Sequence, residues 1–179
     1  MMRAGSSRSL KVRALQWLAQ REQSRVELAA KLLPHAVADA DAAEAAGSPA
    51  AELLPAARVE ALLDWLEAHQ YLSQDRFVES RVHARAPRFG NLRIRHELKQ
   101  HQVALPPDAA QALRDSELQR ARAVRERKFS EVPTSAAERA RQARFLAGRG
   151  FSSEAIRQAL RGAAPEPADD DDEADSAQG

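Results

Sequence analysis

The 179 residues include no cysteine, only 7 glycines and 4% aromatic residues, a composition that favours helices and excludes a disulfide framework or a thiolate metal site. The formal net charge is +1. Residues 163–179 hold seven of the 26 acidic residues and no basic one, so residues 1–162 carry a net charge of +8. A cationic body with an anionic end indicates an acidic or polyanionic partner.

Apolar residues at helical spacing predict the first elements. We expect a helix over 10–22 with Ser9 as its N-cap, and a second over 24–34 that ends near a proline whose ring resists continuation. Residues 36–54 are rich in Ala and Asp and are interpreted as a long loop or a frayed helical insertion. A third helix begins near Pro55 and covers 55–70.

The centre of the chain combines a core pattern with many arginines. Residues 71–103 predict two helices, the first capped by Ser73, joined by a Pro-Arg-Phe-Gly turn at 87–90. A short helix at 107–113 is expected next. The sequence Ser116-Glu117-Leu118-Gln119 matches a capping box and predicts the start of a basic helix that ends near residue 129. Helices at 135–149 and 153–161 complete the folded part.

Three predicted helix ends share one pattern, an apolar residue five positions after a leucine: Leu32 and Val37, Leu98 and Val103, Leu146 and Phe151. This separation is typical of a Schellman ending, and Gly150 occupies the position that needs a positive φ. The recurrence predicts an all-α protein of three tandem three-helix repeats stacked into an elongated curved body. We expect the repeats at 9–72 with the 36–54 insertion, at 73–115 and at 116–162, followed by a disordered acidic tail at 163–179.

Three segments resemble the RecX regulatory proteins, which modulate the recombinase RecA. Leu72-Ser73-Gln74-Asp75-Arg76-Phe77 is similar to the family's Leu-Asp-Asp-Glu-Arg-Phe-like run, although Ser73 and Gln74 replace an acidic pair. Arg93-Ile94-Arg95-His96-Glu97-Leu98 is similar to its Arg-Ile-x-x-Glu-Leu segment, and Phe145-Leu146-x-x-Arg149-Gly150-Phe151 to its C-terminal Leu-x-x-Arg-Gly-Phe. The resemblance covers residues 9–162, and Gln102 stands where the family often has Gly.

The resemblance implies a monomer that lies in the groove of the RecA filament and inhibits the ATPase, strand-exchange and coprotease activities of the recombinase. It also implies weak non-specific binding to single- or double-stranded DNA and a role in DNA repair, recombination and the SOS response. The first residues lack an apolar signal region and no run approaches the roughly 18 apolar residues of a membrane span, so we expect a cytoplasmic protein without a membrane contact.

The sequence offers no catalytic constellation, and we expect a non-enzyme without cofactor or metal. None of the five histidines forms the i,i+4 pair of a zinc-binding helix, and no Gly-rich phosphate loop occurs. The histidines are interpreted as structural or solvated.

The basic residues are therefore the candidate partner- and DNA-binding set, because arginine binds carboxylates and phosphates in bidentate geometry. The predicted site residues are Arg76, Arg81, Arg85, Arg88, Arg93, Arg95, Lys99, Arg122, Arg125 and Lys128. Arg120 and Arg127 belong to the same basic run. Two alternatives remain open: these side chains merely solvate Ala-rich helices, or the chain is a stand-alone helix-turn-helix-like DNA-binding protein.

Overall fold

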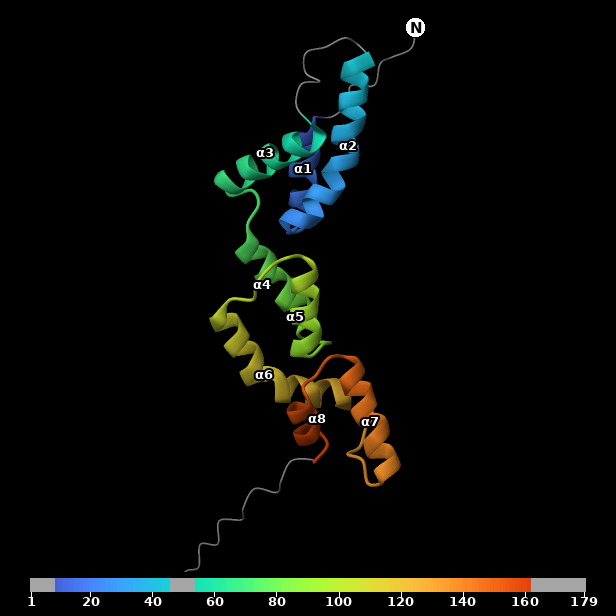
Figure 1. The fold of residues 1–179 in the computed structure, drawn as a ribbon. Helices are drawn as coiled ribbons and strands as arrows, with labels where there is room; N and C mark the ends of the chain where they lie inside the picture. Colours follow the sequence, from blue (N-terminus) through green and yellow to red (C-terminus); the bar gives the residue numbers. More distant parts are fainter. Residues whose placement is uncertain (1–8, 46–53, 162–179) are drawn as a thin grey trace, which may run out of the picture.

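The structure, a computed structural model, describes residues 9–45 and 54–161, and this part contains eight helices and no strand. In chain order they are α1 (Leu10–Gln20), α2 (Arg25–Ala45), α3 (Pro55–Ala68), α4 (Gln74–Arg85), α5 (Asn91–Gln100), α6 (Pro107–Glu126), α7 (Ala136–Gly148) and α8 (Ser153–Ala159). They follow one another along an elongated, bowed body (Figure 1). The all-α prediction is confirmed, whereas the predicted acidic tail lies outside the described residues.

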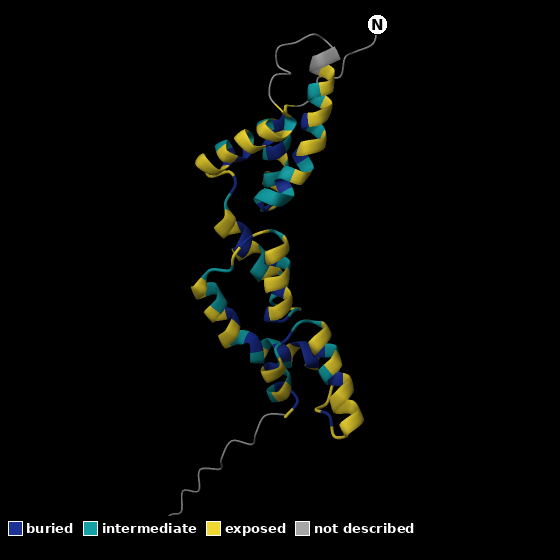
Figure 2. Cartoon of the chain, viewed as in Figure 1, coloured by how far each residue is buried: buried dark blue, intermediate teal, exposed yellow. Residues whose placement is uncertain are grey.

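Three separate hydrophobic clusters occupy the body, each built from residues that are close in sequence. The first joins α1, α2 and α3 around Leu28, Leu32 and Leu63. The second joins α4, α5 and the first half of α6, and the third joins the second half of α6 with α7 and α8. Figure 2 shows the buried residues on the helix faces that meet within each group. Three small cores in series give the helical repeat that the periodicity predicts.

The prediction that the second helix ends near Pro34 is wrong, and so is the interpretation of residues 36–45 as a loop, because these residues are helical. α2 continues through Pro34 to Ala45, and residues 46–53 lie outside the described part. A proline inside a helix removes one backbone hydrogen bond. Here the packing of α2 on α1 and α3 stabilises the helical course, with Leu28, Leu32 and Ala36 fully buried along one face. Arg25 adds ion pairs to α3 through Glu60, Asp64 and Glu67 at 2.6–2.8 Å.

The predicted helix start at Ser116 is also wrong, because α6 runs unbroken through it. The Ser116 hydroxyl donates to the Ala112 carbonyl one turn earlier, the usual alternative to capping for a serine inside a helix. The observed capping box lies at Ser135 and Glu138, where α7 begins. The predicted N-caps Ser9 and Ser73 are confirmed, each accepting a hydrogen bond from a backbone N–H three residues later.

Schellman-type endings occur at three helices, two of them as expected. The N–H groups of Val103 and Phe151 donate to the carbonyls of Leu98 and Leu146, with positive φ at Gln102 (56°) and Gly150 (79°). The predicted ending at Leu32 does not exist, because that residue lies inside α2. The third ending closes α3 instead, where the N–H groups of Tyr71 and Leu72 donate to the Leu66 carbonyl and Gln70 has φ of 61°. These endings turn the chain toward the next helix.

Candidate functional site

A cationic hollow of about 480 Å³ lies between α4 and α5. It is lined by Arg81, Arg85, Arg93, His96, Glu97, Gln100 and His101. We call it the cationic hollow. Arg85 on α4 and Arg93 on α5 both contact the carboxylate of Glu97, at 2.8 and 3.5 Å, and both lie over the Phe89 ring. One carboxylate and one aromatic ring therefore position two guanidinium groups, which remain partly exposed to solvent.

His101 closes the end of the cationic hollow nearest the first helical group. Its Nδ1 lies 3.0 Å from the Ser24 hydroxyl and its Nε2 lies 3.4 Å from an Arg81 guanidinium nitrogen. Burial and then the Arg81 charge lower the pKa of His101. Since a guanidinium only donates, the neutral imidazole accepts at Nε2 and donates to Ser24 through Nδ1. The contact joins α5 to the start of α2.

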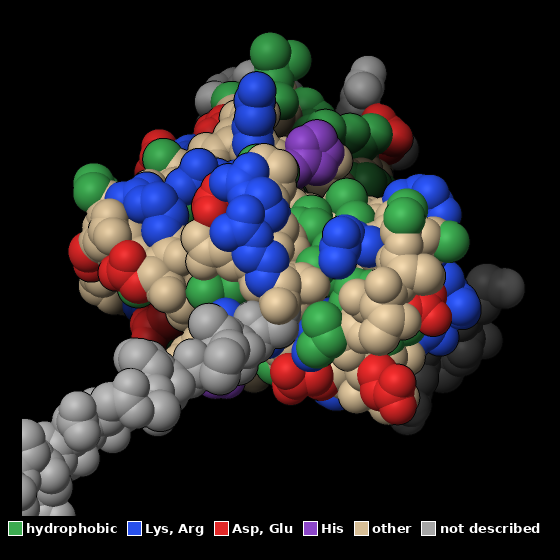
Figure 3. All heavy atoms as spheres, turned by 90° about the horizontal axis from the view of Figure 1, so that it is seen from below, with side chains coloured by type: hydrophobic (Ala, Val, Ile, Leu, Met, Phe, Trp, Pro, Cys, Tyr) green, Lys and Arg blue, Asp and Glu red, His purple; other side chains and the backbone are tan. Residues whose placement is uncertain are grey.

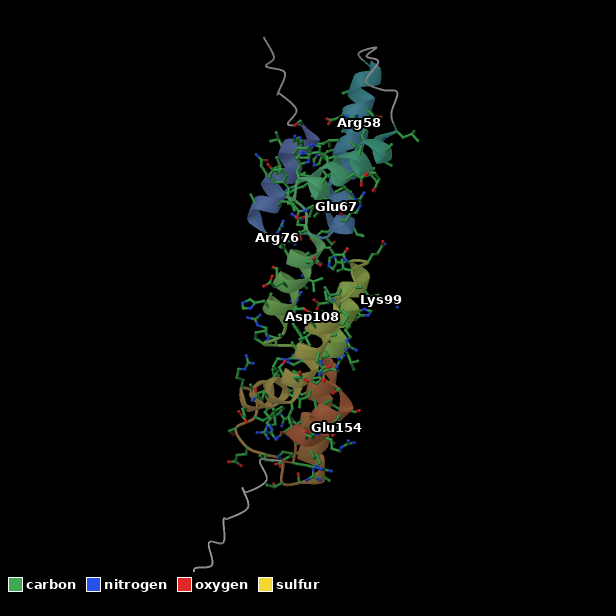
Figure 4. All side chains as sticks on the ribbon, turned by 90° about the vertical axis from the view of Figure 1, so that its left-hand side faces the viewer. Arg58, Glu67, Arg76, Lys99, Asp108 and Glu154 are labelled. Carbon is green, nitrogen blue, oxygen red and sulfur yellow. The ribbon has the colours of Figure 1, made fainter. Side chains whose placement is uncertain are left out.

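The outer side of α5 extends the positive surface beyond the hollow. Leu92, Arg95 and Lys99 follow the i, i+3, i+7 spacing of one helix face and are all exposed, Leu92 by 58%. Neither Arg95 nor Lys99 forms an ion pair with a side chain in the described part of the chain. Lys99 projects from the edge of this helical group in Figure 4. These cations are therefore available to a partner.

A second basic hollow, of about 250 Å³, lies where the second and third hydrophobic clusters adjoin. Its lining residues are Pro87, Arg88, Phe89, Val124, Arg127, Lys128, Phe145 and Arg149. We call it the junction hollow. It brings the predicted residues Arg88 and Lys128 together from distant parts of the sequence. Arg149 lies 3.9 Å from the centre of the Phe145 ring, so a cation and an aromatic face again occur side by side.

Two of the predicted site residues serve the fold instead. Arg125 is buried, donates to the Ala159 carbonyl and pairs with Glu126 at 3.1 Å, so its guanidinium belongs to the third core. Arg76 pairs with Glu22 at 2.7 Å and donates to the carbonyls of Gln70 and Tyr71, which ties α4 to the end of α3. Both side chains bind groups that are distant in the sequence, and the spacing of residues along the chain does not indicate these contacts.

The remaining basic residues divide in the same way. Arg120 is half-buried and donates to the carbonyls of Ala86, Phe89 and Leu113 and to the Asn91 side chain. Burial lowers its pKa, but guanidinium stays charged at neutral pH. Arg122 is partly exposed and lines neither basic hollow.

A buried carboxylate fixes the junction between the second and third helical groups. Glu117 of α6 accepts hydrogen bonds from the N–H of Asn91 at 2.9 Å and from the N–H and hydroxyl of Ser152 at 3.3 and 2.8 Å. It thereby caps the starts of α5 and α8 together. Beside the Glu117 carboxylate, Gly90 and Gly150 allow the two backbones to come into direct contact. The Gly90 N–H donates to the Arg149 carbonyl, and the Leu92 N–H donates to the Gly150 carbonyl.

The sequence interpretation missed Phe89, Phe145, Arg149, His96 and His101 as members of the basic surface. The Pro-Arg-Phe-Gly turn contains Phe89 and the Leu-x-x-Arg-Gly-Phe motif contains Arg149, but the sequence interpretation uses the first only as a turn and the second only as a helix ending and a family resemblance. An aromatic residue beside arginine at a helix end is the sequence signal for a guanidinium group that packs on an aromatic ring.

Seen from the end of the molecule formed by α7 and α8, Lys and Arg side chains gather near the centre, with most acidic side chains toward the edges (Figure 3). Partly exposed guanidinium groups that pack on aromatic rings can bind carboxylates or phosphates, which accept paired hydrogen bonds.

In residues 9–45 and 54–161 no group of His, Asp and Glu is arranged to hold a metal ion, and no helix there is long and apolar enough to cross a membrane.

Comparison with known proteins gives consistent relatives. The family model described as RecX, third three-helix domain, matches residues 115–160. A protein of Leptothrix cholodnii named Regulatory protein RecX is 50% identical over 155 residues, 86% of this chain and 88% of that protein. Proteins of the same name from Ralstonia nicotianae and Neisseria gonorrhoeae are 46% and 30% identical over 158 and 160 residues, 87% and 86% of this chain and 88% and 90% of theirs.

Proposed function

The chain belongs to the RecX family of regulatory proteins, and we propose that it binds the nucleoprotein filament of the recombinase RecA and inhibits it. The observation that carries the proposal is the convergence of Arg81, Arg85 and Arg93 on the cationic hollow, continued by Arg95 and Lys99 on the outer side of α5. A filament offers both carboxylates and DNA phosphates to such a surface.

The proposed mechanism is occupancy of the filament groove. The chain is elongated (Figure 1), and its basic surfaces lie on the second helical group and at the junction with the third, so a single monomer contacts neighbouring protomers at once. Holding protomers in one arrangement hinders ATP turnover, strand exchange and coprotease activity. Contacts to phosphate give the weak, sequence-independent and salt-sensitive DNA binding that accompanies this role.

The test is the ATPase rate of RecA on single-stranded DNA with substoichiometric amounts of the chain. Arg95→Glu reverses one exposed charge on the surface, whereas Arg58→Glu makes the same change on α3 in the first helical group, distant from Lys99 in Figure 4. We expect wild type and Arg58→Glu to inhibit alike. Arg95→Glu should need about tenfold more protein, the effect of roughly 1.4 kcal/mol.

Absence of inhibition by the wild-type chain would refute the proposed function. Equal inhibition by both variants would place binding elsewhere on the molecule. A competition with random duplex DNA addresses the alternative, since strong preference for one duplex sequence indicates a stand-alone DNA reader instead of a filament regulator.

A further inference from the structure

A large apolar groove of about 840 Å³ lies between α4 and α6, on a different side of α4 from the cationic hollow. Its lining residues are Asp75, Val78, Glu79, Val82, His83, Ala86, Pro87, Pro106, Asp108, Ala109, Ala112, Leu113, Ser116 and Arg120. Val78 and Leu113 form part of the second hydrophobic cluster, so the groove opens directly onto that core. The proposed function makes no use of this surface.

The groove exists because α4 and α6 both pack on α5 and leave space between themselves. Small side chains on both walls, Ala86, Ala109 and Ala112, do not fill that space. Elsewhere α6 packs closely on α8 through Ala121, Ala155 and Ala159, which are all buried. Ala112, by contrast, is exposed. The alanines at the C-terminal end of α6 are thus covered by α8, whereas those at its N-terminal end line an open groove.

The shape of the groove favours a helical occupant. Its α4 wall extends from Asp75 to Ala86, which at 1.5 Å per residue is roughly 16 Å, or three helical turns. Its α6 wall repeats at positions 109, 112, 113, 116 and 120. A partner helix places side chains at i, i+3 or i+4, and i+7 along the same length, which is the usual way an amphipathic helix occupies a groove.

The charge of the rim specifies the partner further. Asp75 and Glu79 on α4 and Asp108 on α6 flank the apolar floor. None of the three forms an ion pair with a side chain in residues 9–45 or 54–161. Asp75 and Asp108 also lie in the first turns of their helices, where a carboxylate is favourable and still offers an oxygen to a partner. The guanidinium of Arg120 also lines the groove, but it donates to backbone carbonyls, so these three carboxylates make the rim complementary to Lys and Arg.

We infer that the groove between α4 and α6 docks an amphipathic helix of a protein partner, whose apolar stripe is flanked by Lys or Arg. The apolar stripe covers Val82, Ala109 and Ala112, and the flanking cations meet Asp75, Glu79 and Asp108. This site is separate from the cationic hollow, so one helical group can hold an acidic surface on one side and a basic helix on another.

The test is binding of fluorescein-labelled 18-residue helical peptides to the full chain, followed by anisotropy at low salt. One peptide has Leu at i, i+3 or i+4, and i+7 with flanking Lys, and its counterpart has Glu in place of every Lys. Ala112→Arg fills the groove and repels cations. Ala123→Arg is the matched control, an identical change at an exposed position of α6 that does not line the groove.

We expect the Lys-flanked peptide to bind at least about tenfold more tightly than the Glu-flanked one, and Ala112→Arg to weaken its binding about tenfold while Ala123→Arg leaves it unchanged. Equal binding of both peptides, or no effect of Ala112→Arg in a variant with the wild-type circular dichroism spectrum, would overturn the inference. So would sedimentation showing a dimer that Ala112→Arg dissociates, because a second copy would then occupy the groove.

Discussion

Removing the carboxylate of Glu117 should weaken the junction between the second and third helical groups. In the Glu117→Ala variant the N–H groups of Asn91 and Ser152 lose their acceptor, and of these two residues Asn91 is buried and Ser152 is partly buried. Each buried unsatisfied donor costs about 1–3 kcal/mol. We therefore expect the free energy of unfolding to fall by about 3 kcal/mol.

The Glu117→Gln variant tests whether hydrogen bonding or mere volume is responsible. Its amide oxygen can still accept from both N–H groups, and its amide nitrogen can donate to the Ser152 hydroxyl, which now acts as acceptor. The charge assistance and the acceptor of the Ser152 hydroxyl proton are lost, so the expected cost is about 1 kcal/mol. Gln and Ala variants should consequently differ by about 2 kcal/mol.

The assay is urea unfolding followed by two probes. Far-ultraviolet circular dichroism reports helices throughout the chain, whereas Trp17 and Trp65 both pack on the first hydrophobic cluster and report that group alone. With a urea dependence of about 2 kcal/mol per molar, Glu117→Ala should lower the dichroism midpoint by about 1.5 M and the fluorescence midpoint by less. A dichroism midpoint within about 0.3 M of wild type, or equal losses for Gln and Ala, would refute the reasoning.

Three further changes can be tested by the same unfolding measurement. Gly150→Ala adds a Cβ that lies 2.6 Å from Arg93 at a φ of 79°, and should cost at least about 2 kcal/mol, while Gly148→Ala, with open space around its Cβ, should be neutral or stabilising. Gln102→Gly removes a side chain from a φ of 56° and should stabilise by about 0.5–1 kcal/mol; a loss of stability would contradict a left-handed strain there. Because the folded-state pKa of His101 is lowered, the unfolded chain binds more protons, so stability should fall as pH drops below about 6.5, and His101→Gln should flatten that part of the pH profile.

The sequence predicted those features whose cause is local. Helical spacing and caps at Ser9 and Ser73 located the starts of α1 and α4, and the Leu-to-apolar separation located the turns after Leu98 and Leu146. The prediction of three repeats rests on this separation, which marks a helix ending at Leu98 and Leu146 but not at Leu32. Each of these features depends on residues within about one or two helical turns of one another, so the linear order already contains the information.

The local signals failed where packing opposed them. Pro34 usually ends a helix, but the burial of Leu32 and Ala36 against α1 and α3 outweighs one missing hydrogen bond. Ser116 resembles an N-cap, yet the two cores at the ends of α6 keep that helix continuous around it.

The fate of each arginine was decided by the tertiary structure alone. Sequence identified a cationic chain, but Arg76 and Arg125 pair with groups that approach only after folding, Glu22 and the Ala159 carbonyl, while Arg95 and Lys99 remain open to solvent. A guanidinium has the same local sequence signature in either role. Its availability depends on which acceptors the fold brings within about 3 Å, and those acceptors come from distant parts of the chain.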